Sequence, residues 1–214
     1  MPSVYADAEV TIELLGPLGS YGNNAYIVRP AGGGPVVVID APEGSEAVVA
    51  ALGSAEVSCI LVTHSHFDHW AGFDVLRAFT SAPVCASGDE TNLEPAHQVA
   101  PLADGAEVPV GATTLRVIHA PGHTPGSICL LVGGALLTGD TLFPGGPGRT
   151  GAPEALAQEI ESITSRLHVL PDATVVLPGH GDRTTIGASK LEYADYASRP
   201  HDPGLHGDVL WATS

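Results

Sequence analysis

A short histidine-rich segment, T-H-S-H-F-D-H at residues 63–69, carries the densest chemistry in the chain. It contains three imidazoles, His64, His66 and His69, and the carboxylate of Asp68. These groups bind borderline metal ions such as zinc. A purely structural zinc site is usually rich in cysteine, and this segment contains none. The residue types and their spacing therefore predict a metal site that performs chemistry.

The segment before these residues explains how they can be held in place. Val57–Val62 is an apolar, β-branched run that predicts a buried strand. The potential ligands therefore leave a strand end and enter a loop, and a helix-like pattern begins near Trp70. A loop on a rigid strand end can aim several side chains at one point.

Three distant residues share this context, each after an apolar strand pattern and next to glycine or proline. His123 lies in H-A-P-G-H-T-P-G-S, Asp140 ends L-L-T-G-D, and His180 lies in V-V-L-P-G-H-G. Together with the first segment they provide seven potential ligands. Such a number suits two metal ions that share one ligand, and Asp140 is the natural bridge because a carboxylate has two oxygens.

The sequence gives less reason to place the remaining histidines in the metal site. His119 ends a predicted strand and is a candidate neighbour of the ligands, whereas His168 falls in a helical pattern and is expected to pack. His97, His201 and His206 lie in polar segments and are expected to be solvated.

Four of these segments together resemble the metallo-β-lactamase superfamily: T-H-S-H-F-D-H, P-G-H-T-P-G-S, T-G-D-T-L-F and L-P-G-H-G. Their order and spacing are most similar to the glyoxalase II (hydroxyacylglutathione hydrolase) branch. The resemblance extends from residue 23 to residue 187. It implies an α+β fold with four layers, the αββα sandwich of that superfamily.

The resemblance also implies a role for each candidate ligand. His64, His66 and His123 would hold one metal ion, Asp68, His69 and His180 would hold a second, and Asp140 would bridge the two. Two divalent ions are expected, with zinc favoured and iron or manganese open. Asp68 is also the expected catalytic residue, because it can orient a metal-bridging hydroxide and accept its proton.

An acyl-thioester is the expected substrate, since a thiolate can leave without help from a strong acid. Longer glyoxalase II enzymes append a helical domain that binds the thiol carrier, and the segment after His180 is too short for one. The acyl group and the carrier therefore stay open. Arg149, in the P-G-G-P-G-R-T loop that follows Asp140, is the candidate contact for an anionic substrate group.

Other activities of the same fold remain as alternatives. A persulfide dioxygenase with one iron resembles the chain through T-G-D and G-R-T, although Gly151 stands where that class usually has an acidic residue. A flavodiiron-like redox protein fits less well, because His66 replaces its glutamate. Lactones and other esters stay open. A lactam is disfavoured, because the sequence offers no clear acid for its nitrogen.

Composition and charge restrict the partners. A chain of 214 residues with 44% hydrophobic residues predicts one globular domain spanning residues 1–214. No apolar run approaches the roughly 20 residues needed to cross a membrane, and the first ten residues do not resemble a signal peptide. A formal net charge of −16 disfavours nucleic acid as a partner. We therefore expect a small-molecule substrate, no membrane and no nucleic acid, with the oligomeric state open.

Three cysteines, Cys59, Cys85 and Cys129, lie in apolar surroundings. An odd and sparse set favours reduced thiols and a cytoplasmic location. Alternation of apolar and polar residues predicts strands at 10–15, 24–29, 35–39, 57–62, 83–86, 108–110, 113–118, 127–132, 135–137 and 174–177. Helices are predicted at 43–52, 70–79, 153–169 and 190–197.

Overall fold

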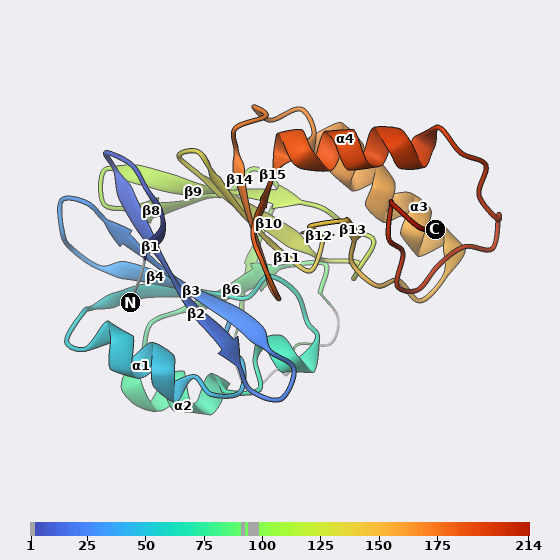
Figure 1. Ribbon diagram of the computed structural model, residues 1–214. Coiled ribbons are helices and arrows are strands. Elements are labelled where there is room, and N and C mark those ends of the chain that lie inside the picture. Colours follow the sequence, from blue (N-terminus) through green and yellow to red (C-terminus); the bar gives the residue numbers. More distant parts are fainter. Residues whose placement is uncertain (1–2, 91–92, 94–98) are drawn as a thin grey trace.

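Two β-sheets packed face to face form the centre of the molecule (Figure 1). The computed structural model describes residues 3–90, 93 and 99–214. The first sheet has the strand order β1 (Ser3–Ala6), β2 (Val10–Leu18), β3 (Asn23–Pro30), β4 (Val36–Ile39), β5 (Val57–Leu61), β6 (Val84–Ser87) and β7 (Ala100–Leu102). Its first four strands pair antiparallel, and β4 to β7 pair in parallel.

The second sheet has the order β15 (Thr184–Thr185), β14 (Val175–Pro178), β11 (Ala135–Gly139), β10 (Ile128–Val132), β9 (Thr113–His119) and β8 (Glu107–Val110). Its β11 and β14 run parallel, and its other pairs are antiparallel. A small two-stranded ribbon, β12 (Leu142–Phe143) with β13 (Gly146–Pro147), follows β11.

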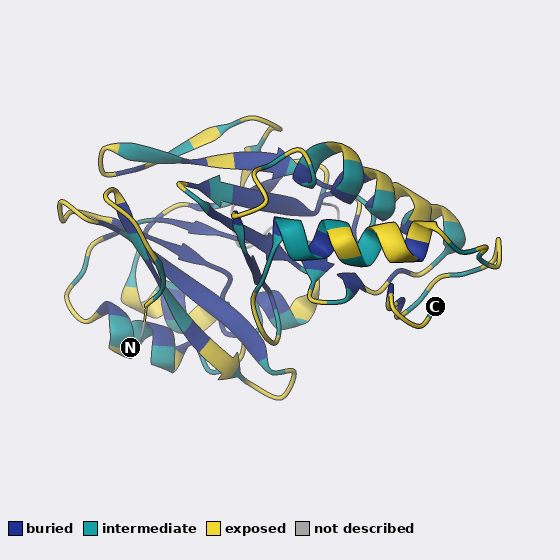
Figure 2. Ribbon diagram, turned by 45° about the horizontal axis from the view of Figure 1, so that its top comes forward, coloured by how far each residue is buried: buried dark blue, intermediate teal, exposed yellow. Residues whose placement is uncertain are grey.

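Helices cover the outer face of each sheet, which completes four layers. Helices α1 (Glu46–Leu52) and α2 (Phe73–Phe79) lie on the first sheet, and α3 (Pro153–Ser162) and α4 (Ile186–Ala197) lie on the second (Figure 1). The strands are largely buried, whereas α4 shows exposed residues on its outer side (Figure 2). The expected αββα sandwich is confirmed. Within the described residues, no helix is long and apolar enough to span a bilayer.

Apolar residues on alternating strand positions form the core between the sheets. One cluster joins Ile12, Val28 and Leu61 of the first sheet to Leu115 and Leu130 of the second, all buried. Separate clusters lie between each sheet and its helices. Burial of such side chains stabilises the fold by about 1.5–3 kcal/mol each.

Several predicted boundaries differ from the structure. The helix expected at 70–79 begins only at Phe73, because Phe67–His69 forms a separate 3₁₀ turn. The helix expected at 153–169 ends its α-helical part at Ser162, and residues 163–167 continue as a π-helical turn. The last helix begins at Ile186 rather than 190, because Thr185 caps it by accepting a hydrogen bond from Ala188 N–H at 3.2 Å.

Residues 205–211, which we call the C-terminal strap, turn back from α4 toward β12, β13 and α3 (Figure 1). The strap is anchored by Trp211, which is fully buried and lies against the rings of Tyr193 and His168. Its backbone pairs with the loop after Asp140. Thr150 and Gly207 exchange backbone hydrogen bonds of 3.2 and 3.0 Å, and Trp211 N–H donates to Gly145 O at 2.8 Å.

Helix α3 buries the carboxyl group of Glu159 beneath two loops. The side chain is 0% exposed, and its Oε1 accepts a hydrogen bond from Gly148 N–H at 3.1 Å. A Cβ atom on Gly122 would overlap Glu159, so this close packing requires a glycine there. Burial raises the pKa of Glu159 to about 9, an effect that Gly148 N–H opposes and the charge of Asp140 reinforces.

This raised pKa makes stability depend on pH. Between about pH 4.5 and about pH 9 the folded chain keeps a proton on Glu159 that the unfolded chain releases. The contribution of Glu159 to the free energy of unfolding therefore falls as pH rises. We expect the free energy of unfolding of the wild type, relative to Glu159→Gln, to decrease from pH 5 to pH 8. The slope is up to about 1.4 kcal/mol per pH unit. Urea unfolding at equal metal content measures it, and parallel pH profiles for the two proteins would contradict a neutral Glu159.

Candidate metal centre

All seven sequence-predicted ligands meet at one edge of the two sheets. His64, His66, Asp68 and His69 lie after β5, and His123 lies in the loop between β9 and β10. Asp140 follows β11 and His180 follows β14, and these two strands are parallel neighbours. Because the carboxyl ends of parallel strands point to the same edge, the last two loops are brought side by side.

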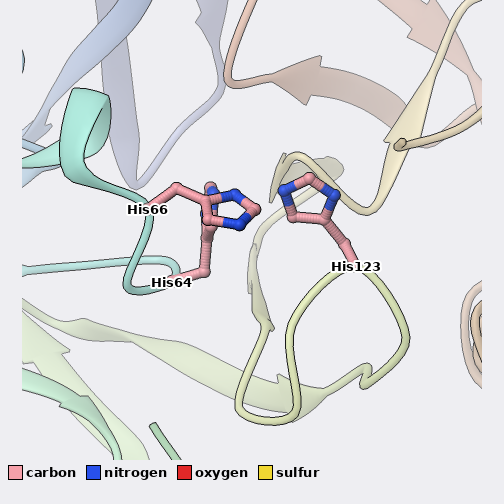
Figure 3. Close-up of side chains that lie close together, drawn as sticks. All are labelled: His64, His66 and His123. Carbon is pink, nitrogen blue, oxygen red and sulfur yellow. The ribbon is translucent and has the colours of Figure 1, made fainter. Parts of the chain in front are cut away.

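The first group of converging side chains consists of His64, His66 and His123 (Figure 3). Each offers one ring nitrogen, and the three nitrogens lie within 4.8 Å of one another. The rings of His66 and His123 come from different sheets, and their centroids are 4.5 Å apart. Three imidazoles directed at one point supply three of the four ligands of a tetrahedral site and leave one position for a further ligand.

The second group consists of Asp68, His69 and His180, whose ligand atoms also lie within 4.8 Å of one another. His180 Nε2 is 3.3 Å from Asp68 Oδ2 and 3.3 Å from His69 Nε2. Asn23, at the start of β3, donates its amide hydrogen to Asp68 Oδ2 at 2.8 Å. The second group is therefore held by β3 of the first sheet as well as by the loops that carry its three residues.

Asp140 lies between the two groups. Its Oδ1 is 3.3 Å from His69 Nε2, and its Oδ2 is 3.4 Å from His180 Nε2 and 3.8 Å from His123 Nε2. A Cβ atom on Gly179 would overlap Asp140 Oδ1, which explains the glycine in the L-P-G-H-G motif. The two carboxylate oxygens thus face both sets of imidazoles.

Hydrogen bonds on the outer ring nitrogens orient the imidazoles. His123 Nδ1 is 2.9 Å from Arg149 O, and His180 Nδ1 is 3.2 Å from Tyr21 O. Since a carbonyl oxygen can only accept, both Nδ1 atoms carry the hydrogen. The Nε2 atom of each ring is therefore the nitrogen that faces a metal ion.

Asp40, at the end of β4, orients two further histidines. Its Oδ2 lies 2.8 Å from His69 Nδ1 and accepts a hydrogen bond from Thr63 Oγ1 at 2.9 Å, while Oδ1 accepts from Thr63 N–H at 2.8 Å. Thr63 Oγ1 in turn lies 3.1 Å from His64 Nδ1. Asp40 has a φ of 61°, a left-handed conformation that is uncommon for non-glycine residues.

Electrostatics divide the histidines into two kinds. Burial lowers the pKa of His123 to about 4 and, together with the neighbouring His69, holds the pKa of His64 well below its usual value. Burial also opposes charge on His180, but its hydrogen bonds to Asp140 and Asp68 outweigh burial and raise its pKa to about 9. His64 and His123 are thus neutral at pH 7, whereas a metal ion would displace a proton from His180.

Buried polar atoms without partners test whether this donor set fits metal ions. Within the described residues, His64 Nε2, His123 Nε2 and Asp140 Oδ1 are buried and have no hydrogen-bond partner. Such atoms are costly to bury unless something binds them. All three point into the cluster, and imidazole and carboxylate are suitable ligands for divalent transition metals. The residues present therefore fit divalent metal ions.

Two adjoining cavities open onto the cluster. The wider one, about 910 Å³, is lined by polar residues that include His66, Asp68, His180 and His206. The smaller one, about 290 Å³, lies between the β12–β13 ribbon and the C-terminal strap. Arg149 lines both cavities, where its Nε is 3.5 Å from Asp208 Oδ2 and both side chains are mostly exposed.

Among the other histidines that the structure describes, His206 is the one that reaches a cavity next to the cluster. His119 contacts Pro125 O at 2.9 Å rather than a ligand, so it is not a direct neighbour of the ligands. His168 packs against Trp211, as expected. His201 stacks on Tyr196 and is only partly exposed, so its expected solvation was wrong. His97 lies outside the described residues. His206 is exposed, as expected, and lines the wider cavity.

Sequence reasoning missed three contributors to the site: Asn23, Asp40 and the C-terminal strap. Asp40 carried a usable signal, since it ends the apolar run V-V-V-I-D in the same way that Asp140 ends its own strand. Asn23 and the strap offered none, because their roles depend on contacts with residues distant in the chain.

Comparison with known proteins places the chain in a family. Residues 18–180 match the model of the metallo-beta-lactamase superfamily. An uncharacterized protein of Mycobacterium leprae is 32% identical over 203 residues, which cover 81% of this chain and 93% of that protein. A hydroxyacylglutathione hydrolase of Cereibacter sphaeroides is 39% identical over 168 residues, covering 74% of this chain and 62% of that enzyme.

A solved structure agrees with these matches. TTHA1623, crystallised in a di-iron-bound form, superposes with a TM-score of 0.70 at 29% identity, covering 83% of this chain and 96% of that one. The four-layer fold, the converging histidines and carboxylates, and the matches to known sequences agree. The chain belongs to the metallo-beta-lactamase superfamily and is similar to its glyoxalase II-like branch.

Proposed function

We propose that the protein is a metal-dependent hydrolase with a two-metal site. His64, His66 and His123 hold one ion, and Asp68, His69 and His180 hold the other. Asp140 contributes an oxygen to each. The observation that carries this proposal is the pair of three-residue groups with Asp140 between them.

Zinc is the first candidate for both ions, with iron and manganese as alternatives. Imidazole and carboxylate ligands suit all three metals, so the donor set alone does not choose among them. The di-iron form of TTHA1623 supports iron as the main rival to zinc.

When held by these residues, two divalent ions would supply a hydroxide nucleophile near pH 7. The side chains of the protein position this nucleophile and accept its proton. Asp68 orients this nucleophile and accepts its proton at a carboxylate oxygen, while Asn23 holds Asp68 by the 2.8 Å hydrogen bond to Oδ2. Asp40 and Thr63 keep the rings of His69 and His64 fixed during the reaction.

We propose an acyl-thioester as the substrate. A carbon–oxygen bond forms at the carbonyl carbon, the carbon–sulfur bond breaks, and its electron pair leaves on sulfur as a thiolate. An ordinary thiol has a pKa of about 8.5, so the thiolate departs without a strong acid. The match to hydroxyacylglutathione hydrolases supports this choice, and hydroxyacyl thioesters are the first compounds to test. Because the chain spans about 62% of the Cereibacter enzyme, its carrier is not inferred from that match.

A persulfide dioxygenase is the alternative from another class of reaction, with a lactone or other ester hydrolase as the alternative within the same class. The G-R-T triplet at 148–150 favours the dioxygenase, whereas Gly151 and the second group of ligands favour the hydrolase. Three free cysteines support a cytoplasmic location, and the formal net charge of −16 supports a small-molecule substrate rather than nucleic acid.

Arg149 is the proposed contact for an anionic group of the substrate. Its side chain is 74% exposed at the rim shared by both cavities. The ion pair with Asp208 is solvent-exposed, so a carboxylate of the substrate can replace Asp208 at little cost.

The first prediction from the proposed function concerns metal content. We expect about two transition-metal ions per wild-type chain, because two three-residue groups share Asp140. Asp140→Ala should reduce the content toward zero, since it removes a ligand from both ions, and His180→Ala should reduce it toward one. Elemental analysis after dialysis measures both. A wild-type content of one that added metal does not raise would favour the mono-iron alternative, and equal losses in the two variants would show that Asp140 does not bridge.

The second prediction concerns Asp68. Asp68→Asn conserves the shape of the side chain, but it removes the proton acceptor and weakens the second metal site, so we expect kcat for a thioester to fall by about 100-fold or more. Asp74→Asn, which removes the same charge from the exposed side of α2, serves as the matched control and should change kcat little. Thioesters, lactones, lactams and glutathione persulfide are offered in parallel. Turnover of lactams without thioesters, or oxygen consumption with the persulfide, would overturn the proposed function.

The third prediction concerns Arg149. Arg149→Gln should raise KM about two- to fivefold for a thioester of glutathione, which is anionic, because an exposed ion pair contributes little. The KM for a neutral N-acetylcysteamine thioester should not change. Arg183→Gln, another exposed arginine that lines neither cavity, is the control. An equal change in KM for both carriers would rule out charge recognition by Arg149.

A further inference from the structure

The smaller cavity differs in character from the wider one, although both reach the cluster. It is lined by His123, Asp140 and His180 at its inner end. Its other walls come from the β12–β13 ribbon and the strap, and are formed largely by Phe143, Pro144, Pro147, Val209 and Leu210. We call this cavity the apolar lobe. The wider cavity is lined mainly by polar side chains.

The two walls of the apolar lobe are held firmly against each other. A Cβ atom on Gly146 would lie 2.7 Å from Val209 O, so the ribbon and the strap approach as closely as glycine permits. Trp211 fixes one end of the strap, and the paired backbones of Thr150 and Gly207 fix the other. The lobe is therefore a preformed feature of the fold, as ligand pockets usually are.

Among the apolar residues of the strap that line this cavity, Leu210 contributes least to the core of the protein. Val209 is 2% exposed and serves the core, whereas Leu210 is 54% exposed beside the reactive cluster. A single exposed leucine on a surface needs no explanation. Here it forms a continuous apolar lining with Phe143 and two prolines that ends at three proposed ligands, which is the usual composition of a substrate pocket.

We propose that the apolar lobe binds an apolar substituent on the acyl group of the substrate, while the wider cavity receives the thiol carrier. This proposal rests on the proposed function, since it assigns the two halves of a thioester to two cavities. Size and polarity support the assignment. The lobe, of about 290 Å³, is slightly smaller than the usual range for ligand pockets, roughly 300–1,000 Å³. It therefore suits a short branched or aromatic group rather than a long chain.

A substrate series with one carrier tests the proposal. Acetyl, isovaleryl and phenylacetyl thioesters of N-acetylcysteamine are compared by kcat/KM for the wild type, Leu210→Trp and Leu191→Trp. Leu191 is the matched control, because it is a leucine 76% exposed on α4 and lines neither cavity. Both variants should keep the wild-type melting temperature, since neither residue is buried.

We expect Leu210→Trp to reduce kcat/KM for the phenylacetyl and isovaleryl compounds about tenfold, the usual effect of a misfitted apolar group. The value for the acetyl compound should stay within about twofold, because that group does not fill the lobe. Leu191→Trp should match the wild type throughout. An equal loss for all three acyl groups, or a loss that follows the carrier when glutathione replaces N-acetylcysteamine, would overturn the assignment.

A binding measurement separates this proposal from the proposed function. Phenylacetate and acetate, the carboxylate products, are titrated calorimetrically into the metal-loaded wild type and Leu210→Trp. We expect phenylacetate to bind the wild type more tightly than acetate, and this preference to disappear in Leu210→Trp. Such a result supports the lobe even when no thioester is hydrolysed, in which case only the proposed function fails. Equal phenylacetate affinity in the two proteins would overturn the lobe whether or not thioesters are hydrolysed.

Discussion

The convergence of strand ends at one edge of two packed sheets is the constraint on which the site depends. The sheets are held together by apolar residues such as Leu61, Leu130 and Leu137. The same strands that bury these residues also end in loops at one edge of the sheets. The loops after β5, β11 and β14 then carry ligands toward a common point. Core packing and site geometry are therefore two consequences of one arrangement.

Burying the polar and charged side chains of the metal-ligand cluster lowers the stability of the fold unless other groups or ions bind them. His64 and His123 present lone pairs beside the carboxylate of Asp140 in a largely buried region, and three of the buried side-chain atoms without partners in the described part of the chain lie there. In the protein alone, protons on His69 and His180 balance the carboxylates, as their raised pKa values indicate. Divalent cations offer a better balance, because each can bind several of these atoms at once. This argument explains why polar atoms that would destabilise an ordinary core are tolerated here.

The sequence predicted most of the longer strands, and the structure brings the seven candidate ligands together, for a physical reason. Apolar runs such as Val57–Leu61 have strong local patterns. His64 stands out because three histidines and an aspartate follow this run closely, and His180 stands out because glycine and proline mark the strand end beside it. Short strands such as β12 were missed, because two residues are too few to show the alternation of apolar and polar residues that indicates a strand. Asp40 acts through Thr63 and His69, and its importance depends on side-chain contacts rather than on composition.

The C-terminal strap was the largest omission. Its residues resemble a polar tail with scattered apolar positions, and only the tertiary structure reveals that Trp211 is buried and that Leu210 faces the site. Local sequence therefore predicts the candidate ligands in this chain, whereas the walls of the cavity that we propose to bind the acyl group come from distant segments. Specificity is the part of the function that most requires the folded structure.

Anomalous X-ray scattering at the metal absorption edge, recorded from crystals of the metal-loaded protein, tests the central claim most directly. The account predicts two strong peaks in the anomalous difference map, one among His64, His66 and His123 and one among Asp68, His69 and His180. Each peak should lie beside an oxygen of Asp140. A single peak in crystals grown with excess metal, or peaks bound by residues outside these two groups, would contradict the account.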